Sequence, residues 1–269
     1  MKRTTRQRAA KYGKRLFLTL VFLFLYLPIF IIMLYSFNTS KMNVLFEGFT
    51  TKWYGVMLNN YALLSAFGNT LIVGFYSTLL STVIGTLAAV AMYRYKFHGK
   101  NVIDMLLYIP VVIPEIVLGI SLLSMFSLCQ VPLGLLSIII AHITFCIPFV
   151  VFTVRARLAG FDRSVEEAAL DLGASRLQVF FRITVPIILP GIISGATLAF
   201  TLSVDDIIIS FFTTGAKSTT FPLKAIELVR TGITPDVYAL STLIILVTFT
   251  IVLVSQLISY KRRLHTGEE

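Results

Sequence analysis

Long apolar runs separated by shorter polar segments make up most of this chain. An α-helix needs about 20 predominantly apolar residues to cross the hydrocarbon core of a bilayer, and the runs have roughly that length. We therefore predict an all-α integral membrane protein with six transmembrane helices. The predicted spans cover about residues 16–37, 69–93, 102–128, 135–154, 187–212 and 237–259, between tails at 1–15 and 258–269.

The longest water-compatible segment inside this pattern, GFDRSVEEAALDLGASRLQVFFRITVPIILPG, covers residues 160–191. Ser164 followed by Glu167 predicts a capping box at the start of a helix, and Gly173 supplies the left-handed residue that commonly ends one. Ser175 can cap a second short helix. A small, mostly apolar face of the first helix contains Ala168, Ala169 and Leu172. By pattern alone, this pair of short helices is either a connector between two spans or a docking surface for a partner.

The composition supports the membrane class, because 57% of the residues are hydrophobic, only 13% are charged and the mean hydropathy is +0.86. The basic N-terminal tail resembles the start of a signal peptide. The apolar run after it is too long for such a peptide and lacks a small-residue cleavage site, so we predict a first membrane helix. Cys129 and Cys146 lack the paired spacing of a zinc or redox site and are predicted to be packing residues.

The net charge of +10 is distributed unevenly along the chain. Of the 23 Lys and Arg residues, seven lie in the N-terminal tail, three in residues 94–100, five in residues 155–182 and three near the C-terminus. Because cytoplasmic loops carry an excess of Lys and Arg, both termini and the central polar segment are predicted to be cytoplasmic. This topology accounts for the basic charge without a nucleic-acid partner.

Three carboxylates lie inside predicted spans, namely Glu115, Asp205 and Asp206. A charged side chain at that depth costs about 2.5–3.5 kcal/mol on insertion scales, so it usually faces a cavity or a partner. Pro110 and Pro114 interrupt the backbone ladder just before Glu115, which indicates an irregular helix that could line a cavity. On a continuous helix, Glu115 would lie roughly 18–20 Å from the cytoplasmic boundary, near the midplane. The three acids are therefore candidates for a cation path.

Asp206 is the stronger of the two adjacent candidates, because Ser203 and Ser210 share its helix face whereas Asp205 shares its face with apolar neighbours. We expect Asp206 to face the path. The alternative is that each acid is protonated or hydrogen-bonded to a neighbouring helix. His142, in the middle of the fourth span, is predicted to be an interhelical hydrogen-bond residue.

Catalytic and metal-binding motifs are absent from the sequence. It contains no GxxxxGK[ST] phosphate loop, and no HExxH, GxSxG, CxxC or EF-hand pattern. We therefore expect no catalytic residues, no metal site and no ATP-binding site in this chain.

The central segment resembles the EAA signature of permease subunits of binding-protein-dependent ABC importers. The matching residues are Glu167, Ala168, Ala169, Gly173, Ala174, Ile183, Pro186 and Pro190, and Val185 stands where leucine is usual. The resemblance covers about residues 67–257. Further stretches resemble the subfamily of spermidine/putrescine permeases, of the PotC type: GFTTKWY at 48–54, AVAMYRYKFHGK at 89–100, AHITFCIPFVV at 141–151 and FTLSVDDIIISFFTTG at 200–215.

This resemblance implies a type I ABC importer (MetI-like) permease fold in the bacterial cytoplasmic membrane, with a coupling loop at 155–186. It implies a second permease subunit as heterodimer partner, two cytoplasmic ATPase subunits that carry ATP and Mg²⁺, and an external binding protein that delivers the polyamine. This chain would bind no cofactor itself. The residues implied to couple it to the ATPase are Glu167, Ala168, Ala169, Leu172, Gly173 and Ala174. The segment FPLKAIELVRTG, at 221–232, would help to dock the binding protein.

Three other functions remain open at this point. A related permease could carry another substrate, such as ferric iron or a phosphonate, although acids in the membrane argue against an anionic cargo. In a proton-coupled secondary transporter, Glu115 and Asp206 would carry protons, but such proteins usually show an internal repeat, which we do not find between the two halves. A structural membrane scaffold would not need acids at this depth.

Overall fold

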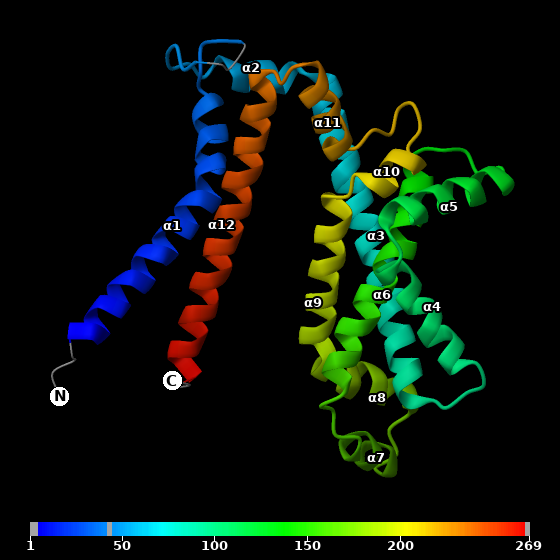
Figure 1. Cartoon of the computed structure of the whole chain (residues 1–269). Helices are drawn as coiled ribbons and strands as arrows, with labels where there is room; N and C mark the ends of the chain where they lie inside the picture. Colours follow the sequence, from blue (N-terminus) through cyan, green and yellow to red (C-terminus); the bar gives the residue numbers. More distant parts are fainter. Residues whose placement is uncertain (1–4, 42–44, 267–269) are drawn as a thin grey trace. The chain divides into compact units, whose positions relative to one another are not determined.

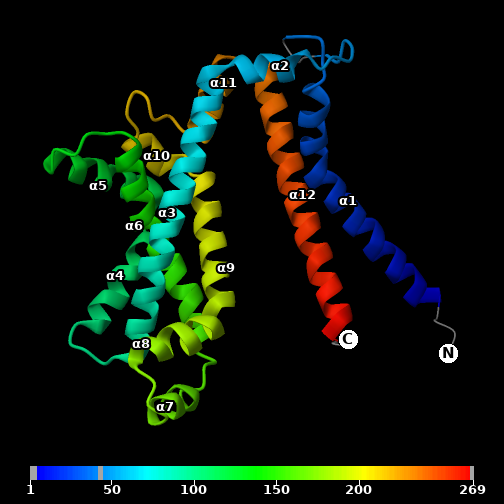
Figure 2. The ribbon, with the colours of Figure 1, turned by 180° about the vertical axis from the view of Figure 1, so that it is seen from behind.

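The computed structural model describes residues 5–41 and 45–266, with side chains described for 11–41, 45–250 and 253. Within these residues the regular elements are helices, apart from one isolated antiparallel bridge between Asn38 and Phe49. The helices, drawn in Figures 1 and 2, are α1 (Thr5–Tyr35), α2 (Lys52–Asn59), α3 (Tyr61–Arg94), α4 (Lys100–Val112), α5 (Glu115–Leu128), α6 (Leu135–Leu158), α7 (Ser164–Asp171), α8 (Arg176–Val179), the π-helix η1 (Phe180–Thr184), α9 (Val185–Val204), α10 (Ile208–Thr213), α11 (Phe221–Thr231) and α12 (Pro235–Thr266).

The predicted all-helical membrane class is confirmed, whereas the six predicted spans are not all seen as such. Among the described residues, four helical stretches are long and apolar enough to cross a membrane: Lys11–Tyr35, Tyr61–Arg94, Leu135–Leu158 and Arg176–Val204. A fifth crossing is obtained if α4 and α5 count as one span, although they are bent by 113°. Within the part of α12 whose side chains are described, the apolar stretch is Pro235–Thr250.

The bend between α4 and α5 shows where the third predicted span, over 102–128, is interrupted. The helix α4 ends at Val112, and Ile113 and Pro114 adopt extended conformations before α5 begins at Glu115. A proline lacks the backbone N–H that would continue the helical ladder, and it disfavours helical geometry in the residue before it. The predicted irregularity is confirmed, and the uninterrupted helix assumed in deducing the depth of Glu115 is not formed.

The chain divides into two compact units, one formed by residues up to Leu64 and from Glu227 onward, and the other by residues 65–226. In the first unit, α1 and α2 both pack on α12. Trp53 of α2 is buried, and its indole Nε1 donates a hydrogen bond of 2.6 Å to the carbonyl oxygen of Asn38. Asn60 donates a hydrogen bond of 2.7 Å to the Asp236 carboxylate at the start of α12. The first bond ties α2 to the segment that follows α1, and the second holds the end of α2 against α12.

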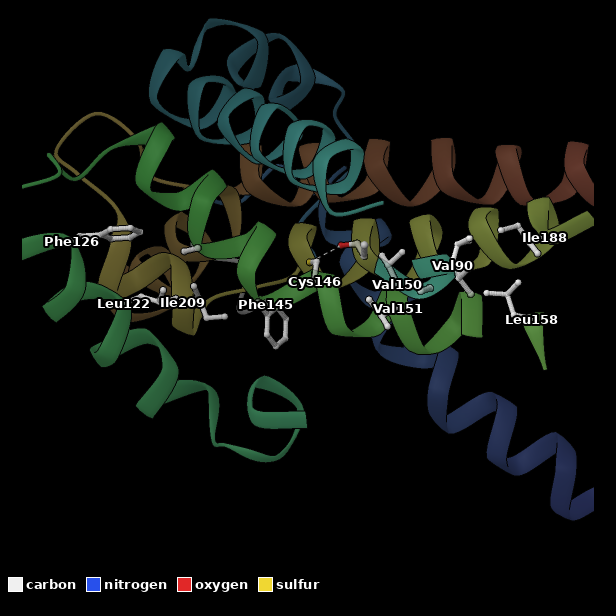
Figure 3. Close-up of a cluster of buried hydrophobic side chains, with 14 residues drawn as sticks. Val90, Leu122, Phe126, Phe145, Cys146, Val150, Val151, Leu158, Ile188 and Ile209 are labelled. Carbon is white, nitrogen blue, oxygen red and sulfur yellow. Dashed lines mark hydrogen bonds between the residues drawn. The ribbon is translucent and has the colours of Figure 1, made fainter. Parts of the chain in front are cut away.

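The second unit is built around α6, which packs along α9. In Figure 3, Val150 and Leu158 of α6 lie beside Ile188 of α9 and Val90 of α3, and all four are buried. Cys146 is fully buried and approaches the carbonyl oxygen of Ala199 at 3.6 Å, so its predicted packing role is confirmed. Cys129 is exposed, and the same prediction is wrong for it. It lies just after the end of α5, where it contributes little to a core.

Glycines allow this close packing of helices. A Cβ atom added to Gly85 of α3 would lie 2.8 Å from the Cβ of Val150, and one added to Gly191 of α9 would lie 2.8 Å from the Cβ of Arg157. A Cβ on Gly119 of α5 would lie 2.6 Å from the ring of Phe212 in the adjoining α10. In a bilayer, helix association depends on van der Waals packing and interhelical hydrogen bonds, so small residues at the contact have a direct energetic role.

Candidate functional site

The first short helix of the central polar segment, α7, begins differently from the prediction. Its N-cap residue is Arg163, which makes no side-chain capping bond, and the predicted capping box between Ser164 and Glu167 is not formed. Instead, Asp162 Oδ1 accepts a hydrogen bond of 2.9 Å from the backbone N–H of Ser164. Hydrogen bonds from the Ser164 backbone and side chain lower the pKa of the Asp162 carboxyl. This aspartate therefore satisfies one backbone donor at the helix start, and Glu167 is exposed.

The end of α7 confirms the prediction made from Gly173. This glycine has a φ of +87°, and its N–H donates to the carbonyl oxygen of Leu170 at 2.9 Å. The N–H of Ala174 donates to the carbonyl oxygen of Ala169 at 3.0 Å. These two bonds form a Schellman motif, which closes a helix with a left-handed residue.

The second short helix, α8, is capped by Ser175 as predicted. The Gln178 N–H donates to Ser175 Oγ at 3.3 Å, and the Ser175 N–H donates to Gln178 Oε1 at 2.8 Å. This reciprocal pair is a capping box. The chain then continues through the π-helix η1 directly into α9. We refer to residues 164–184 as the knob.

The predicted coupling residues lie largely on the surface of the knob. Glu167, Ala168, Leu172 and Gly173 are exposed, while Ala169 and Ala174 are half-buried. Leu172 is 90% exposed, and Leu177 and Phe181 are also well exposed. Exposed apolar side chains that gather on one short segment are typical of a surface that contacts another protein.

The knob is attached to the end of α3 by polar contacts that sequence reasoning missed. Arg94 forms an ion pair with Glu166 of α7 and donates a hydrogen bond of 2.6 Å to Thr184 Oγ1 of η1. Arg163 donates a hydrogen bond of 2.6 Å to the carbonyl oxygen of Tyr93 and lies 4.4 Å from the centre of the Tyr93 ring. In the sequence, Arg94 looked only like a positive charge at the end of a span, and the glutamate before the EAA signature gave no separate signal.

A second polar group lies at a break between α9 and α10. The predicted helix over 187–212 is interrupted at residues 205–207, where Asp206 turns inward. Its carboxylate accepts hydrogen bonds from the backbone N–H groups of Ile209 and Ser210, at 3.2 Å and 2.7 Å. These bonds satisfy donors at the start of α10 that would otherwise be unpaired.

His142 of α6 connects this break to the neighbouring helices. Its Nε2 lies 3.2 Å from Asp206 Oδ2 and 3.1 Å from Ser210 Oγ, and its Nδ1 lies 2.7 Å from Ser203 Oγ. Ser203 in turn forms a hydrogen bond of 2.9 Å with Ser77 of α3. The prediction that His142 bonds between helices is confirmed, as is the grouping of Ser203 and Ser210 around Asp206. We call these five residues the buried network.

Burial distinguishes the two adjacent acids, Asp205 and Asp206. The Asp206 side chain is only 3% exposed, enclosed by its own chain, whereas Asp205 is exposed. The helix break explains the difference, because the prediction placed both residues on one continuous helix. Glu115 is also exposed, at the first turn of α5. A role for any of the three in transport stays a prediction.

Comparison with known sequences identifies a protein family that matches this chain. The family described as binding-protein-dependent transport system inner membrane component matches residues 81–263. The spermidine/putrescine transport system permease protein PotC of Escherichia coli (strain K12) is 43% identical over 253 residues, covering 94% of this chain and 96% of that protein. The putrescine transport system permease protein PotI of the same organism is 42% identical over 235 residues, covering 85% of this chain and 84% of that protein.

Solved structures show the same fold. A chain of a bacterial ABC transporter involved in the import of the acidic polysaccharide alginate aligns with a TM-score of 0.74 at 15% identity, covering 97% of this chain and 99% of that one. A chain of the MetNI methionine ABC transporter, in an inward facing conformation, aligns with a TM-score of 0.57 at 19% identity, covering 78% of this chain and 97% of that one.

These similarities agree with the apolar helices and with the exposed, capped knob. The chain is a multi-pass bacterial membrane protein and a transport subunit rather than an enzyme. It belongs to the family of binding-protein-dependent transport system inner membrane components.

Proposed function

We propose that this chain is one of two permease subunits of an ATP-driven importer that takes up polyamines, spermidine or putrescine or both. The observation that carries this proposal is the 43% identity to a spermidine/putrescine permease, which extends over 94% of the chain. The similarity to a putrescine permease, at 42% identity, supports the same class of cargo. An external binding protein would deliver the polyamine, and the segment 221–232, which contains α11, would help to dock it.

The proposed topology has six crossings, with α4 and α5 as one broken span and α12 as the last crossing. The 32 residues of α12 have a helical length of roughly 48 Å, which exceeds the thickness of the hydrocarbon core. Both termini and the knob would lie in the cytoplasm. The positive-inside rule supports this orientation. Arg94 and Arg155 lie at or near the ends of α3 and α6 that adjoin the knob, and Arg163 directly precedes α7.

The knob would dock in a groove of a cytoplasmic ATPase subunit. Leu172 and Leu177 offer apolar side chains for that contact, and the low volume of Ala168 and Ala169 allows a partner's backbone to approach. ATP and Mg²⁺ would bind to the ATPase subunits, and this chain would hold no cofactor. Closure of the ATPases on ATP would displace the knob and tilt the spans, which would switch access from the outside to the inside.

The substrate path would use the acids near the α5 and α10 helices. A polyamine carries several ammonium groups, and carboxylates in a cavity of low dielectric constant would attract it strongly. Glu115 and Asp205 are exposed on this chain, and they would face a path shared with the second permease subunit. Asp206 would act at shorter range, by holding the break between α9 and α10 in position.

Reconstitution of the complete transporter tests this function. This subunit, purified from its native membrane with its partners, should bring a second permease, an ATPase and a binding protein. In proteoliposomes, ATP should drive the uptake of radiolabelled spermidine or putrescine, and ferric iron or a phosphonate should not compete. Uptake that needs no ATP and is abolished by a proton ionophore would instead indicate a secondary transporter. ATP-driven uptake of ferric iron or a phosphonate, without polyamine uptake, would replace the proposed cargo.

A further inference from the structure

Arg94 bonds to both ends of the knob. Among the described residues of the second unit that lie outside the knob, it is the only one whose charged side chain does so. It is the last residue of α3, Glu166 lies in the first turn of α7, and Thr184 is the last residue of η1. The guanidinium pairs with the Glu166 carboxylate and donates to the Thr184 hydroxyl at 2.6 Å. Three elements that are separate in the sequence therefore meet at one cation.

The threonine hydroxyl closes the three contacts into a ring. Thr184 Oγ1 accepts from Arg94 and donates to Glu166, so each of the three side chains contacts the other two. Thr184 is only 1% exposed, and its hydroxyl has no room to exchange these partners for bulk water. A hydroxyl group can donate and accept at the same time, which is why it can join a cation to an anion.

Partial burial makes this ring stronger than a surface ion pair. The side chains of Arg94 and Glu166 are 19% and 12% exposed. They line a cavity of about 180 Å³ together with the neighbouring side chains of Tyr95, Leu170, Arg176 and Val179. Pairs removed from bulk water in this way are screened less by salt than exposed pairs, and hydrogen bonds between charged groups are the strong ones.

The same end of α3 holds the start of the knob a second time. The Arg163 guanidinium lies over the Tyr93 ring, and the Tyr93 hydroxyl donates a hydrogen bond of 3.3 Å to the carbonyl oxygen of Phe161. Residues 93 and 94 therefore contact the chain before, within and after α7. On the far side, η1 runs into α9 without a break, and short π segments in helices are frequent at functional sites.

We propose that Arg94, Glu166 and Thr184 form an internal clamp that transmits displacement of α7 to both α3 and α9. This proposal depends on the proposed docking of the knob to an ATPase. It assigns the transmission of movement to residues outside the docking face. Arg94, Glu166 and Thr184 are positioning residues, because each bonds to the other two. Without the clamp, the ATPase would still dock and hydrolyse ATP, but α7 would move without carrying the spans with it.

The test measures how much spermidine enters proteoliposomes for each ATP hydrolysed by the complete transporter. Glu166→Gln removes the charge and keeps the side-chain shape, and we expect it to lower this ratio about tenfold while the ATPase still co-purifies. The matched control is Asp104→Asn, which breaks another Arg–carboxylate pair of the same unit, that with Arg155, without a contact to the knob. It should leave the ratio within about twofold of the unchanged transporter.

Two further variants keep the proposal open to refutation if Glu166→Gln assembles poorly. Thr184→Val keeps both charges and nearly the same volume, and it should lower the ratio by a smaller factor than Glu166→Gln. The exchange Arg94→Glu with Glu166→Arg restores a pair of opposite charges that Thr184 can still bridge, so it should recover at least half of the lost ratio.

The possible results distinguish a failure of the clamp proposal from a failure of the proposed function. An unchanged ratio in both Glu166→Gln and Thr184→Val would overturn the clamp, and so would loss of the ATPase from these complexes, since that would make the ring part of the docking face. A failure of the exchanged pair to recover transport, in a complex that assembles, would also overturn it. Absence of ATP-driven uptake of both spermidine and putrescine by the unchanged transporter would reject the proposed function, and this result is distinct from a loss confined to the clamp variants.

Discussion

The clamp of the knob and the buried network each pair a carboxylate with a basic side chain, but in different environments. Each contains a carboxylate, a basic side chain and at least one hydroxyl group. The clamp pairs Glu166 with an arginine, and both side chains remain 12–19% exposed beside a cavity. The buried network pairs Asp206 with His142, and those side chains are 3% and 1% exposed.

The comparison shows that the exposure of a carboxylate to water decides which basic side chain suits it and how many further hydrogen bonds it needs. Near water, a permanent cation such as arginine costs little to desolvate, and one strong pair is sufficient. In the enclosed network, the carboxylate receives two backbone N–H bonds in addition to the histidine, because an unsatisfied buried charge would be costly. The clamp therefore needs only its ion pair and the bridging hydroxyl group, whereas the carboxylate of the network also needs backbone donors.

The largest effect is expected where the buried network loses its acceptor. Asp206→Ala leaves His142 and the Ser210 N–H without their partner, and we expect it to lower the free energy of unfolding by about 3 kcal/mol. Thermal unfolding of the detergent-solubilised protein can be followed by labelling of buried Cys146 with a thiol dye, in a Cys129→Ser background. The exposed neighbour is the control, and Asp205→Ala should change stability by less than about 0.5 kcal/mol. Equal losses in both variants would contradict the difference in burial.

The next largest effect is expected on the exposed face of the knob. It concerns binding of the ATPase subunits rather than folding of this chain. Leu172 is 90% exposed, so Leu172→Asp should leave the unfolding midpoint nearly unchanged. A charge placed in an apolar contact should weaken binding of the ATPase subunits by about 2 kcal/mol, or roughly thirtyfold. Co-purification at a series of salt concentrations measures this loss. If the ATPase bound as tightly to Leu172→Asp as to the unchanged subunit, the docking face would have to lie elsewhere.

A smaller effect is expected at the helix contact between α3 and α6. A methyl group on Gly85 would lie 2.8 Å from Val150, so Gly85→Ala should cost about 1–2 kcal/mol of stability through overpacking. Gly68 lies on the same helix with nothing within 4 Å of an added Cβ. Gly68→Ala should be neutral or stabilising by up to about 1 kcal/mol, because alanine is the better helix former. The same labelling assay compares the two, and a loss in Gly68→Ala as large as in Gly85→Ala would show that steric contact is not the cause.

The smallest effect is expected at the exposed start of the knob. The pKa of the Asp162 carboxyl lies below its ordinary value of 3.8 because Ser164 donates to it. A lowered pKa means that the stabilisation is fully present above about pH 3.8 and is lost as the pH falls through the lower folded value. Hydrogen exchange at Ser164, corrected for its intrinsic pH dependence, should show protection that decreases toward pH 3, and Asp162→Asn should flatten this decrease. A decrease of the same size in Asp162→Asn would assign it to another group.

Several features were predictable from sequence because they depend on residues close together in the chain. The left-handed Gly173, the cap at Ser175 and the interruption at Pro114 each follow from one residue type and its immediate neighbours. The cap of α7 was predicted wrongly for a related reason, since Asp162 and Ser164 compete for the same helix start and their order of preference depends on local geometry.

The sequence by itself determined the membrane class, the helical content, the position of the knob and the family. These properties depend on the length of apolar runs and on short motifs, which a linear chain displays directly. Only the tertiary structure decided which charged groups meet. Arg94 and Glu166 are 72 residues apart, and the contact of His142 with Ser203 joins residues 61 apart. Such pairs depend on helix packing, on close approaches at glycines and on the break at residues 205–207, which turned Asp206 inward and left Asp205 exposed.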